Sequence, residues 1–139
     1  IDFKDEGIDF LTLIKRLHAI DGIERIRFGS LEPRVITETF AEELSKLPKI
    51  CPHFHLSLQS GCDDTLKRMN RHYTCEEYAE RCAILRKYFE NPAITTDVIV
   101  GFPGETDADF ETTREFLEKV HFYEMHVFPV FPGHFFLEF

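Results

Sequence analysis

The sequence predicts an α/β fold in which a few parallel strands alternate with helices. Short β-branched or alternating apolar segments are separated by amphipathic segments, and capping or turn signals mark the boundaries between them. Strands that alternate with helices pair in parallel through right-handed crossovers. Because four strands are too few to close a barrel of about eight, we expect an open parallel sheet or an arc of a partial barrel.

Five helices are expected. The first ends at Asp21-Gly22 and the second at Pro48, both of which interrupt helices. Thr74 and Thr106 are each followed three residues later by a carboxylate, a pattern typical of helix N-termini. In the last helix, Phe110, Thr113, Leu117 and Val120 are expected to point inward. The expected helices span residues 7–20, 37–47, 63–70, 74–89 and 106–120.

Four strands are expected at residues 24–30, 54–58, 94–100 and 123–130. The stretch 94–106 (ITTDVIVGFPGET) passes from a β-branched run into a glycine-rich turn and then a helix start. Glycines allow the backbone to approach a ligand closely, and the first turn of a helix has free N–H groups. This stretch therefore predicts a functional loop at the C-terminal edge of a strand.

The composition indicates one folded domain. The 139 residues are 43% hydrophobic, and the net charge of −9 argues against a broad nucleic-acid clamp formed by this chain alone. No apolar run approaches a membrane span, and the N-terminus does not resemble a signal peptide. The chain starts without Met, so we expect a piece of a longer protein. The four cysteines lack zinc-site spacing and are interpreted mainly as buried thiols, which favours a cytoplasmic location.

Polar residues gather where the predicted strands end. Glu32 follows the first strand, Ser57 and Gln59 end the second, and Asp97 and Gly101 belong to the third. Ligands of parallel α/β folds bind at this edge, so these residues indicate a small-molecule site.

No nucleophile paired with a base is found, which indicates that reactive chemistry comes from a bound cofactor. His53 and His55 are interpreted as structural histidines. The basic run Lys67, Arg68, Arg71 and His72 either complements a helix C-terminus or captures an anion, and spacing alone does not decide between these alternatives.

Three segments resemble the radical S-adenosylmethionine methylthiotransferases: residues 25–33 (RIRFGSLEP), 53–74 (HFHLSLQSGCDDTLKRMNRHYT) and 94–106. These enzymes add a methylthio group to adenosine 37 of tRNA or to an aspartate of a ribosomal protein. The variants GSLEP and HLSLQSGCD resemble the branch acting on N6-threonylcarbamoyladenosine. The alternatives are the isopentenyladenosine branch, the ribosomal-protein branch, or a binding or scaffold module without clusters.

The resemblance implies that residues 1–130 form the last four strands of a partial (β/α)6 barrel, with an unassigned tail at 131–139. It also implies S-adenosylmethionine as cofactor. Ser57 and Gln59 would contact its ribose and methionine, Gly101 would lie beside its adenine, and Arg71 would bind its carboxylate. Glu32 and Asp97 are expected as further polar contacts.

Two [4Fe–4S] clusters would be present in the full-length enzyme. The family binds one through C-x3-C-x2-C, and this motif is absent from the chain. We therefore expect no metal ligand and no catalytic residue here, and no activity from the chain alone. The full-length enzyme would bind the anticodon loop of tRNA, and no membrane contact is expected. Exposed strand edges predict self-association of the isolated chain.

Overall fold

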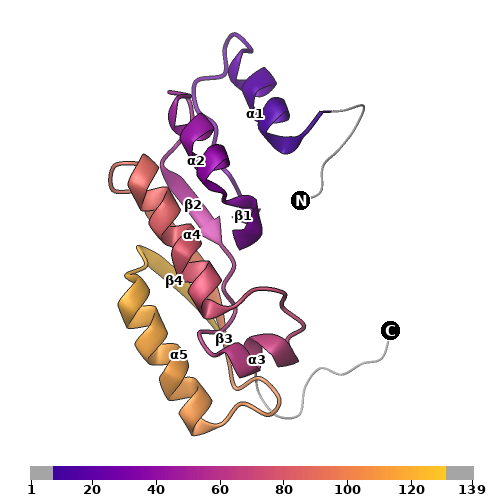
Figure 1. The fold of residues 1–139 in the computed structure, drawn as a ribbon, viewed down its shortest axis with the longest axis vertical. Helices are drawn as coiled ribbons and strands as arrows, with labels where there is room; N and C mark the ends of the chain where they lie inside the picture. Colours follow the sequence, from indigo (N-terminus) through magenta and orange to yellow (C-terminus); the bar gives the residue numbers. More distant parts are fainter. Residues whose placement is uncertain (1–7, 131–139) are drawn as a thin grey trace.

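A computed structural model describes residues 8–130 and shows a parallel sheet of four strands in the order β1-β2-β3-β4 (Figure 1). Neighbours in the sheet are also neighbours along the chain, each pair joined by a crossover that contains a helix. This confirms the predicted α/β class. The elements are α1 (Phe10–His18), β1 (Ser30–Leu31), the 3-10 helix η1 (Pro33–Val35), α2 (Glu38–Ser45), β2 (His53–Leu56), α3 (Asp63–Arg68), α4 (Cys75–Tyr88), β3 (Ala93–Val100), α5 (Asp107–Val120) and β4 (Glu124–Pro129).

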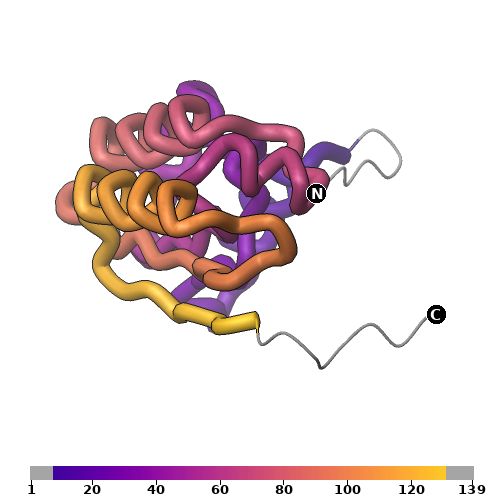
Figure 2. Tube along the Cα trace, turned by 90° about the horizontal axis from the view of Figure 1, so that it is seen from below, coloured from indigo at the N-terminus to yellow at the C-terminus, as the bar shows by residue number. Residues whose placement is uncertain are grey.

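The helices form a layer on one face of the sheet. In Figures 1 and 2, α4 and α5 run side by side, and α2 continues the layer next to α4. The side chains beneath this layer are apolar and almost fully excluded from solvent. Burial of each such side chain stabilises the folded state by about 1.5–3 kcal/mol. They include Phe54 and Leu56 of β2, Ile94 and Val98 of β3, and Tyr78 and Leu85 of α4.

The helix starts were predicted well. Thr74 and Thr106 both make the reciprocal hydrogen bonds of a capping box, with Glu77 and Asp109 as the respective carboxylates. At the start of both α4 and α5, the N–H groups of the capping threonine and of the carboxylate residue are therefore satisfied locally.

The first strand is shorter than predicted. Ile26 bridges Ile50, but regular pairing with β2 begins only at Ser30 opposite His55. From Ile26 to Ser30 the chain advances four residues, whereas the partner segment advances five, from Ile50 to His55. The segment that leads into β2 therefore contains one extra residue. This offset breaks the ladder, and the expected strand 24–30 is reduced to β1.

The second strand ends before the predicted Leu58. Pairing of His55 with Thr95 and of Gln59 with Val98 differs in offset by one residue, which places one extra residue in the β2 segment. Such a bulge interrupts the ladder and re-aims the residues that follow.

Side chains replace the missing ladder bonds at this bulge. The Thr96 hydroxyl donates to the Leu56 carbonyl (2.6 Å) and accepts from the Leu58 N–H (2.9 Å). The buried Tyr78 hydroxyl donates to the same Leu56 carbonyl at 2.7 Å. The end of β2 is thus held by buried polar contacts, which sequence periodicity could not reveal.

The inward face of α5 differs from the prediction at one position. Thr113 and Val120 are buried, whereas Phe110 is 46% exposed. The helix docks where it meets Gly61: a Cβ on this glycine would lie 2.9 Å from the Phe116 Cβ. Close contact to a glycine turns the Thr113, Phe116 and Val120 face inward and leaves Phe110 outside.

Strand β4 forms an exposed edge of the sheet. All six of its residues are exposed, among them Met125, Val127 and Phe128. Exposed strand edges favour pairing with another chain, so self-association stays a prediction. Among residues 8–130, no helix has the length and apolar character needed to cross a membrane. The expected tail at 131–139 lies outside the described residues.

Candidate functional site

Tyr73 organises the edge where β1 and β2 end. Its hydroxyl donates to the carbonyls of Ser57 (2.9 Å) and Leu58 (2.8 Å). Burial raises the pKa of Tyr73 to about 12, with the nearby Arg71 charge opposing the rise and the Glu32 charge adding to it. Of the predicted site residues, Ser57 thus contacts this tyrosine, and Arg71 and Glu32 act on it through their charges. Sequence reasoning missed Tyr73, although its place directly after the basic run is a usable signal.

Gln59 has a backbone conformation that is uncommon for its residue type. Its φ is 73°, in the left-handed region, while its N–H donates to the Asp97 carbonyl at 2.9 Å and its carbonyl accepts from the Ile99 N–H at 2.8 Å. Such a conformation costs about 1–3 kcal/mol and is retained where the surroundings impose it, often at functional sites. The half-buried Gln59 is therefore held rigidly at the edge.

The loop after β3 brings bare backbone to the same edge. Gly101 has φ 74°, and a Cβ there would lie 2.9 Å from the Val130 carbonyl oxygen, so only glycine fits without strain. The Glu105 carboxylate accepts hydrogen bonds from the N–H groups of Gly101 and Phe102. The loop is thereby fixed by a residue that the sequence analysis did not single out.

The basic run divides into two parts. Arg68 donates to the Asp109 carboxylate (3.0 Å) and to the Thr65 hydroxyl (2.9 Å), so it ties α3 to the start of α5. Lys67 lies beside it in the last turn of α3, where a cation complements the helix dipole. Arg71 lies beyond the helix and is exposed. The structural interpretation therefore suits Lys67 and Arg68, and Arg71 stays the candidate for anion binding.

The sheet face opposite the helices carries a polar cavity of about 550 Å³. Asp97 lies here, in the middle of β3, and its carboxylate accepts from His55 and His126. At the amino-terminal end, Arg27 donates to His53, whose pKa is lowered by burial and by the charge of Arg27. The cavity is lined by Arg27, Phe28, Gly29, Ser30, His53, His55, Thr95, Asp97, Glu124 and His126.

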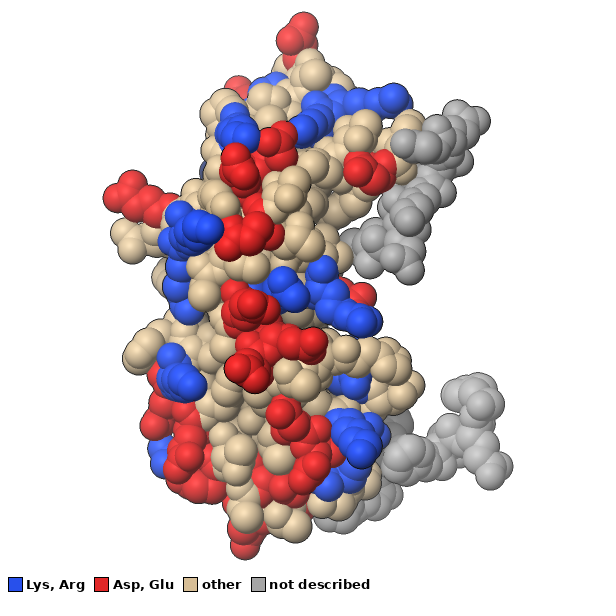
Figure 3. All heavy atoms as spheres, in the orientation of Figure 1, with Lys and Arg blue, Asp and Glu red and all other residues tan. Residues whose placement is uncertain are grey.

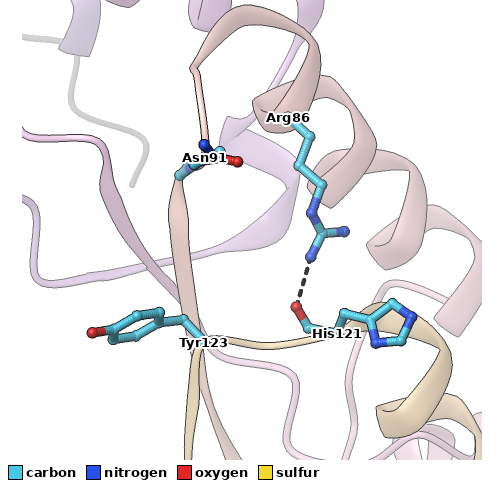
Figure 4. A pocket seen from close by; sticks show the side chains of 5 residues that line it. Arg86, Asn91, His121 and Tyr123 are labelled. Carbon is cyan, nitrogen blue, oxygen red and sulfur yellow. Dashed lines mark hydrogen bonds between the residues drawn. The ribbon is translucent and has the colours of Figure 1, made fainter.

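A second cavity, of about 370 Å³, lies at the amino-terminal ends of β3 and β4 (Figure 4). Arg86 points into it from α4 and donates to the carbonyls of Val120 (2.6 Å) and His121 (3.0 Å). These carbonyls end α5, and His121 takes the left-handed conformation typical of a helix C-terminus. This cavity therefore belongs to a capping arrangement.

The cysteines do not form a cluster-binding set. All four are free, and the Cys62 thiol donates to Asp109 at 3.4 Å. Burial raises the pKa of Cys82 to about 12 and, together with Asp63, raises that of Cys75. Thiolates are the ligands of iron–sulfur clusters, and burial disfavours them here. In residues 8–130, no group of three or more His, Cys, Asp or Glu is arranged to hold a metal ion.

The fold and the edge define the class of protein. A parallel sheet with helices on one face and polar side chains on the other is an arc of a (β/α) barrel, whose ligands bind at the strand C-termini. The family model described as Radical SAM superfamily matches residues 3–117. The chain belongs to this superfamily.

Similar proteins include several tRNA-modifying enzymes. A tRNA-2-methylthio-N(6)-dimethylallyladenosine synthase of Sulfurovum sp. is 45% identical over 128 residues, covering 92% of this chain and 30% of that protein. The enzyme of the same name from Opitutus terrae is 49% identical over 119 residues, covering 86% and 25%. The threonylcarbamoyladenosine tRNA methylthiotransferase MtaB of Thermotoga maritima is 41% identical over 129 residues, covering 93% and 30%.

A solved structure shares the fold. Coproporphyrinogen III oxidase (HemN) of Escherichia coli, a radical SAM enzyme, superimposes with a TM-score of 0.69 at 17% identity, covering 86% of this chain and 28% of that one. The match supports the barrel arc and carries no information on substrate. The chain spans only 25 to 30% of the length of these curated relatives.

Proposed function

We propose that this chain is part of a tRNA methylthiotransferase and contributes to its S-adenosylmethionine site. The observation that carries the proposal is the similarity of almost the whole chain to such enzymes at 41–49% identity. As a tRNA-modifying enzyme, the full-length protein would act in the cytoplasm on the anticodon loop. The two [4Fe–4S] clusters would be held by other parts of that protein, because the cysteines described here do not fit one.

The edge at the strand ends fits a zwitterionic nucleoside cofactor. Arg71 offers a planar pair of donors for the methionine carboxylate, and Ser57 and Gln59 offer polar groups for the ribose and methionine. Gly101, where the absence of a side chain lets the Val130 carbonyl approach, would lie beside the adenine. Glu32, whose charge acts on Tyr73, would be a further polar contact. When bound, S-adenosylmethionine supplies the radical chemistry that activates an unreactive C–H bond.

For the substrate, we propose tRNA carrying N6-dimethylallyladenosine, also called isopentenyladenosine. The two relatives with this printed activity are 45% and 49% identical to the chain, against 41% for the threonylcarbamoyladenosine enzyme. The similarity thus favours the alternative of the sequence analysis over its preferred branch.

The threonylcarbamoyl branch is a second candidate because of two observations. The motif variants GSLEP and HLSLQSGCD resemble that branch. In addition, the open-face cavity is lined mostly by polar groups and contains the cation Arg27. A threonylcarbamoyl group carries a carboxylate that Arg27 could pair with, whereas a dimethylallyl group has only apolar surface.

Mass spectrometry of tRNA nucleosides tests the proposal. The full-length protein, reconstituted with iron and sulfide, is expected to convert N6-dimethylallyladenosine in tRNA to its 2-methylthio derivative. Conversion of threonylcarbamoyladenosine instead would establish the second candidate, and Arg27→Met would then reduce it. Absence of both products from a reconstituted enzyme would refute the methylthiotransferase assignment.

Calorimetric titration of the chain with S-adenosylmethionine tests the cofactor edge separately. We expect binding that Arg71→Ala weakens by about tenfold, because a hydrogen bond to a charged group is worth about 1.5–3 kcal/mol. Lys67→Ala is the matched control, since Lys67 belongs to the helix end. Equal affinities of the two variants would contradict the role of Arg71.

A further inference from the structure

Four side chains form a continuous hydrogen-bonded chain across the open face of the sheet. The Thr95 hydroxyl lies 3.0 Å from Nδ1 of His55, and Nε2 of His55 lies 3.2 Å from one Asp97 oxygen. The other Asp97 oxygen lies 3.3 Å from Nδ1 of His126. The chain joins strands β2, β3 and β4, and the two imidazole centroids are 6.4 Å apart.

The Asp97 carboxylate determines where the imidazole protons lie. An ionised carboxylate only accepts hydrogen bonds, so His55 donates through Nε2–H and His126 donates through Nδ1–H. Nδ1 of neutral His55 then accepts from the Thr95 hydroxyl, and both its ring nitrogens are satisfied. In neutral His126, the second nitrogen, Nε2, is left as an acceptor. No hydrogen bond to this nitrogen is found within residues 8–130.

Side-chain exposure increases along this hydrogen-bonded row, from His55 through Asp97 to His126. The side chains of His55 and Asp97 are 15% and 25% exposed, whereas that of His126 is 60% exposed. His126 lines the cavity, and Glu124 lines it from the same strand, two residues earlier. The less exposed His55 and Asp97 therefore fix the orientation of His126, and His126 faces the space that a ligand would occupy.

We propose that His126 binds the exocyclic N6–H of an N6-monosubstituted adenine and that Asp97 is the positioning residue that keeps its Nε2 an acceptor. This inference rests on the proposed function. Dimethylallyl and threonylcarbamoyl substituents each leave one hydrogen on N6, so the contact is common to both candidate substrates. Discrimination between them falls to the other residues of the cavity, Arg27 among them.

Nitrogen-15 NMR of the histidine rings tests the positioning role of Asp97. At pH 8, wild-type His126 is expected in the Nδ1–H form, and Asp97→Ala is expected to return it to the Nε2–H form that an unconstrained neutral imidazole favours. Thr95→Val is the matched control, because it removes the far end of the chain and leaves the Asp97–His126 contact. A His126 tautomer that Asp97→Ala leaves unchanged overturns the positioning role.

Nucleoside titration tests the contact itself. N6-dimethylallyladenosine is expected to shift the His126 ring resonances, whereas N6,N6-dimethyladenosine, which has no N6 hydrogen, is expected to leave them in place. His126→Phe keeps a flat ring without the acceptor and is expected to weaken binding of the first nucleoside about five- to tenfold. Unmoved His126 resonances with N6-dimethylallyladenosine, or equal shifts with both nucleosides, overturn the proposal.

Failure of the His126 contact can be distinguished from failure of the proposed function. If the contact is found but the full-length enzyme forms no methylthio product, the adenine site stands and the reaction assignment fails. If product forms in tRNA while the His126 resonances do not respond, the reaction stands and the role of His126 fails. Neither readout depends on a bound cluster in the chain.

Discussion

The two faces of the sheet are built from the same strands and have opposite chemistry. Toward the helices, β2 and β3 present Phe54, Leu56 and Ile94, which are at most 1% exposed. Toward the open side, alternate positions carry His55 and Asp97, linked by a hydrogen bond. One period-two pattern therefore produces a packed core on one side and a ligand-facing surface on the other.

This difference makes the open face the candidate functional surface. Parallel strands covered by helices on both faces are almost continuously apolar, and the polar alternation of β2 departs from that rule. Figure 3 shows the outer surface of the helix layer, where acidic and basic side chains are interspersed as on an ordinary solvated surface. The ordered histidine and aspartate row is confined to the other side of the sheet.

Substitution in the covered face should have the largest effect on stability. Phe54→Ala is expected to lower the free energy of unfolding by about 3–5 kcal/mol, because it removes a fully buried ring that stacks on Phe28 and meets Phe89 edge-to-face. His53→Ala, one residue earlier on the open face, is expected to cost less than about 1 kcal/mol. Urea denaturation measures both, and similar losses would break the distinction between the faces.

A smaller effect is expected from the polar contact buried beneath the helices. Tyr78→Phe removes one hydroxyl that donates to the Leu56 carbonyl, which keeps a second donor in Thr96. We expect a loss of about 1 kcal/mol in the free energy of unfolding. Tyr88→Phe is the control, since burial raises the pKa of Tyr78 whereas Tyr88 is only partly buried and its hydroxyl lies beside the exposed Glu38. If Tyr78→Phe leaves the free energy of unfolding unchanged, the hydroxyl of Thr96 is sufficient to hold the end of β2.

Much of this fold could be predicted because its signals are local. The capping boxes at Thr74 and Thr106 and the glycine turn at Gly101 lie within a few consecutive residues. The bulge in β2 could not be predicted, because it depends on Thr96, a residue of another strand. Phe110 was misplaced for the same reason, since the docking of α5 is decided by contact with the distant Gly61.

The candidate site was predicted in part. Ser57 and Glu32 were chosen for their places at strand ends, and Arg71 for the basic run and the family resemblance. Tyr73 donates to the Ser57 carbonyl, and the charges of Arg71 and Glu32 act on its pKa. His53 and His55 were interpreted as structural, yet His55 shares one carboxylate with His126 across three strands. A contact between residues 29 positions apart depends on strand order and register, which periodicity within a single strand does not contain.

The smallest effect on stability is expected from Asp109, whose carboxylate accepts a hydrogen bond from Arg68 and so links α5 to α3. The Thr106 backbone N–H, followed by Cys62 and Arg68, lowers the pKa of Asp109 to about 2 from its usual 3.8. A depressed pKa contributes stability above the unfolded value, and this contribution is lost as the pH falls from about 4 to about 2. Asp109→Asn should therefore destabilise the chain at neutral pH, and its difference from wild type should shrink across that window.

Urea denaturation between pH 2 and pH 7 measures this change. Asp107→Asn, in the same first turn of α5, is the matched control, because within residues 8–130 the carboxylate that it removes makes no hydrogen bond to α3. Some pH dependence will remain in the Asp109→Asn variant, because Lys15 and Lys46 lower the pKa of Glu43 to about 2 as well. If both aspartate variants follow the same curve, the Asp109–Arg68 link between α3 and α5 contributes nothing specific to stability.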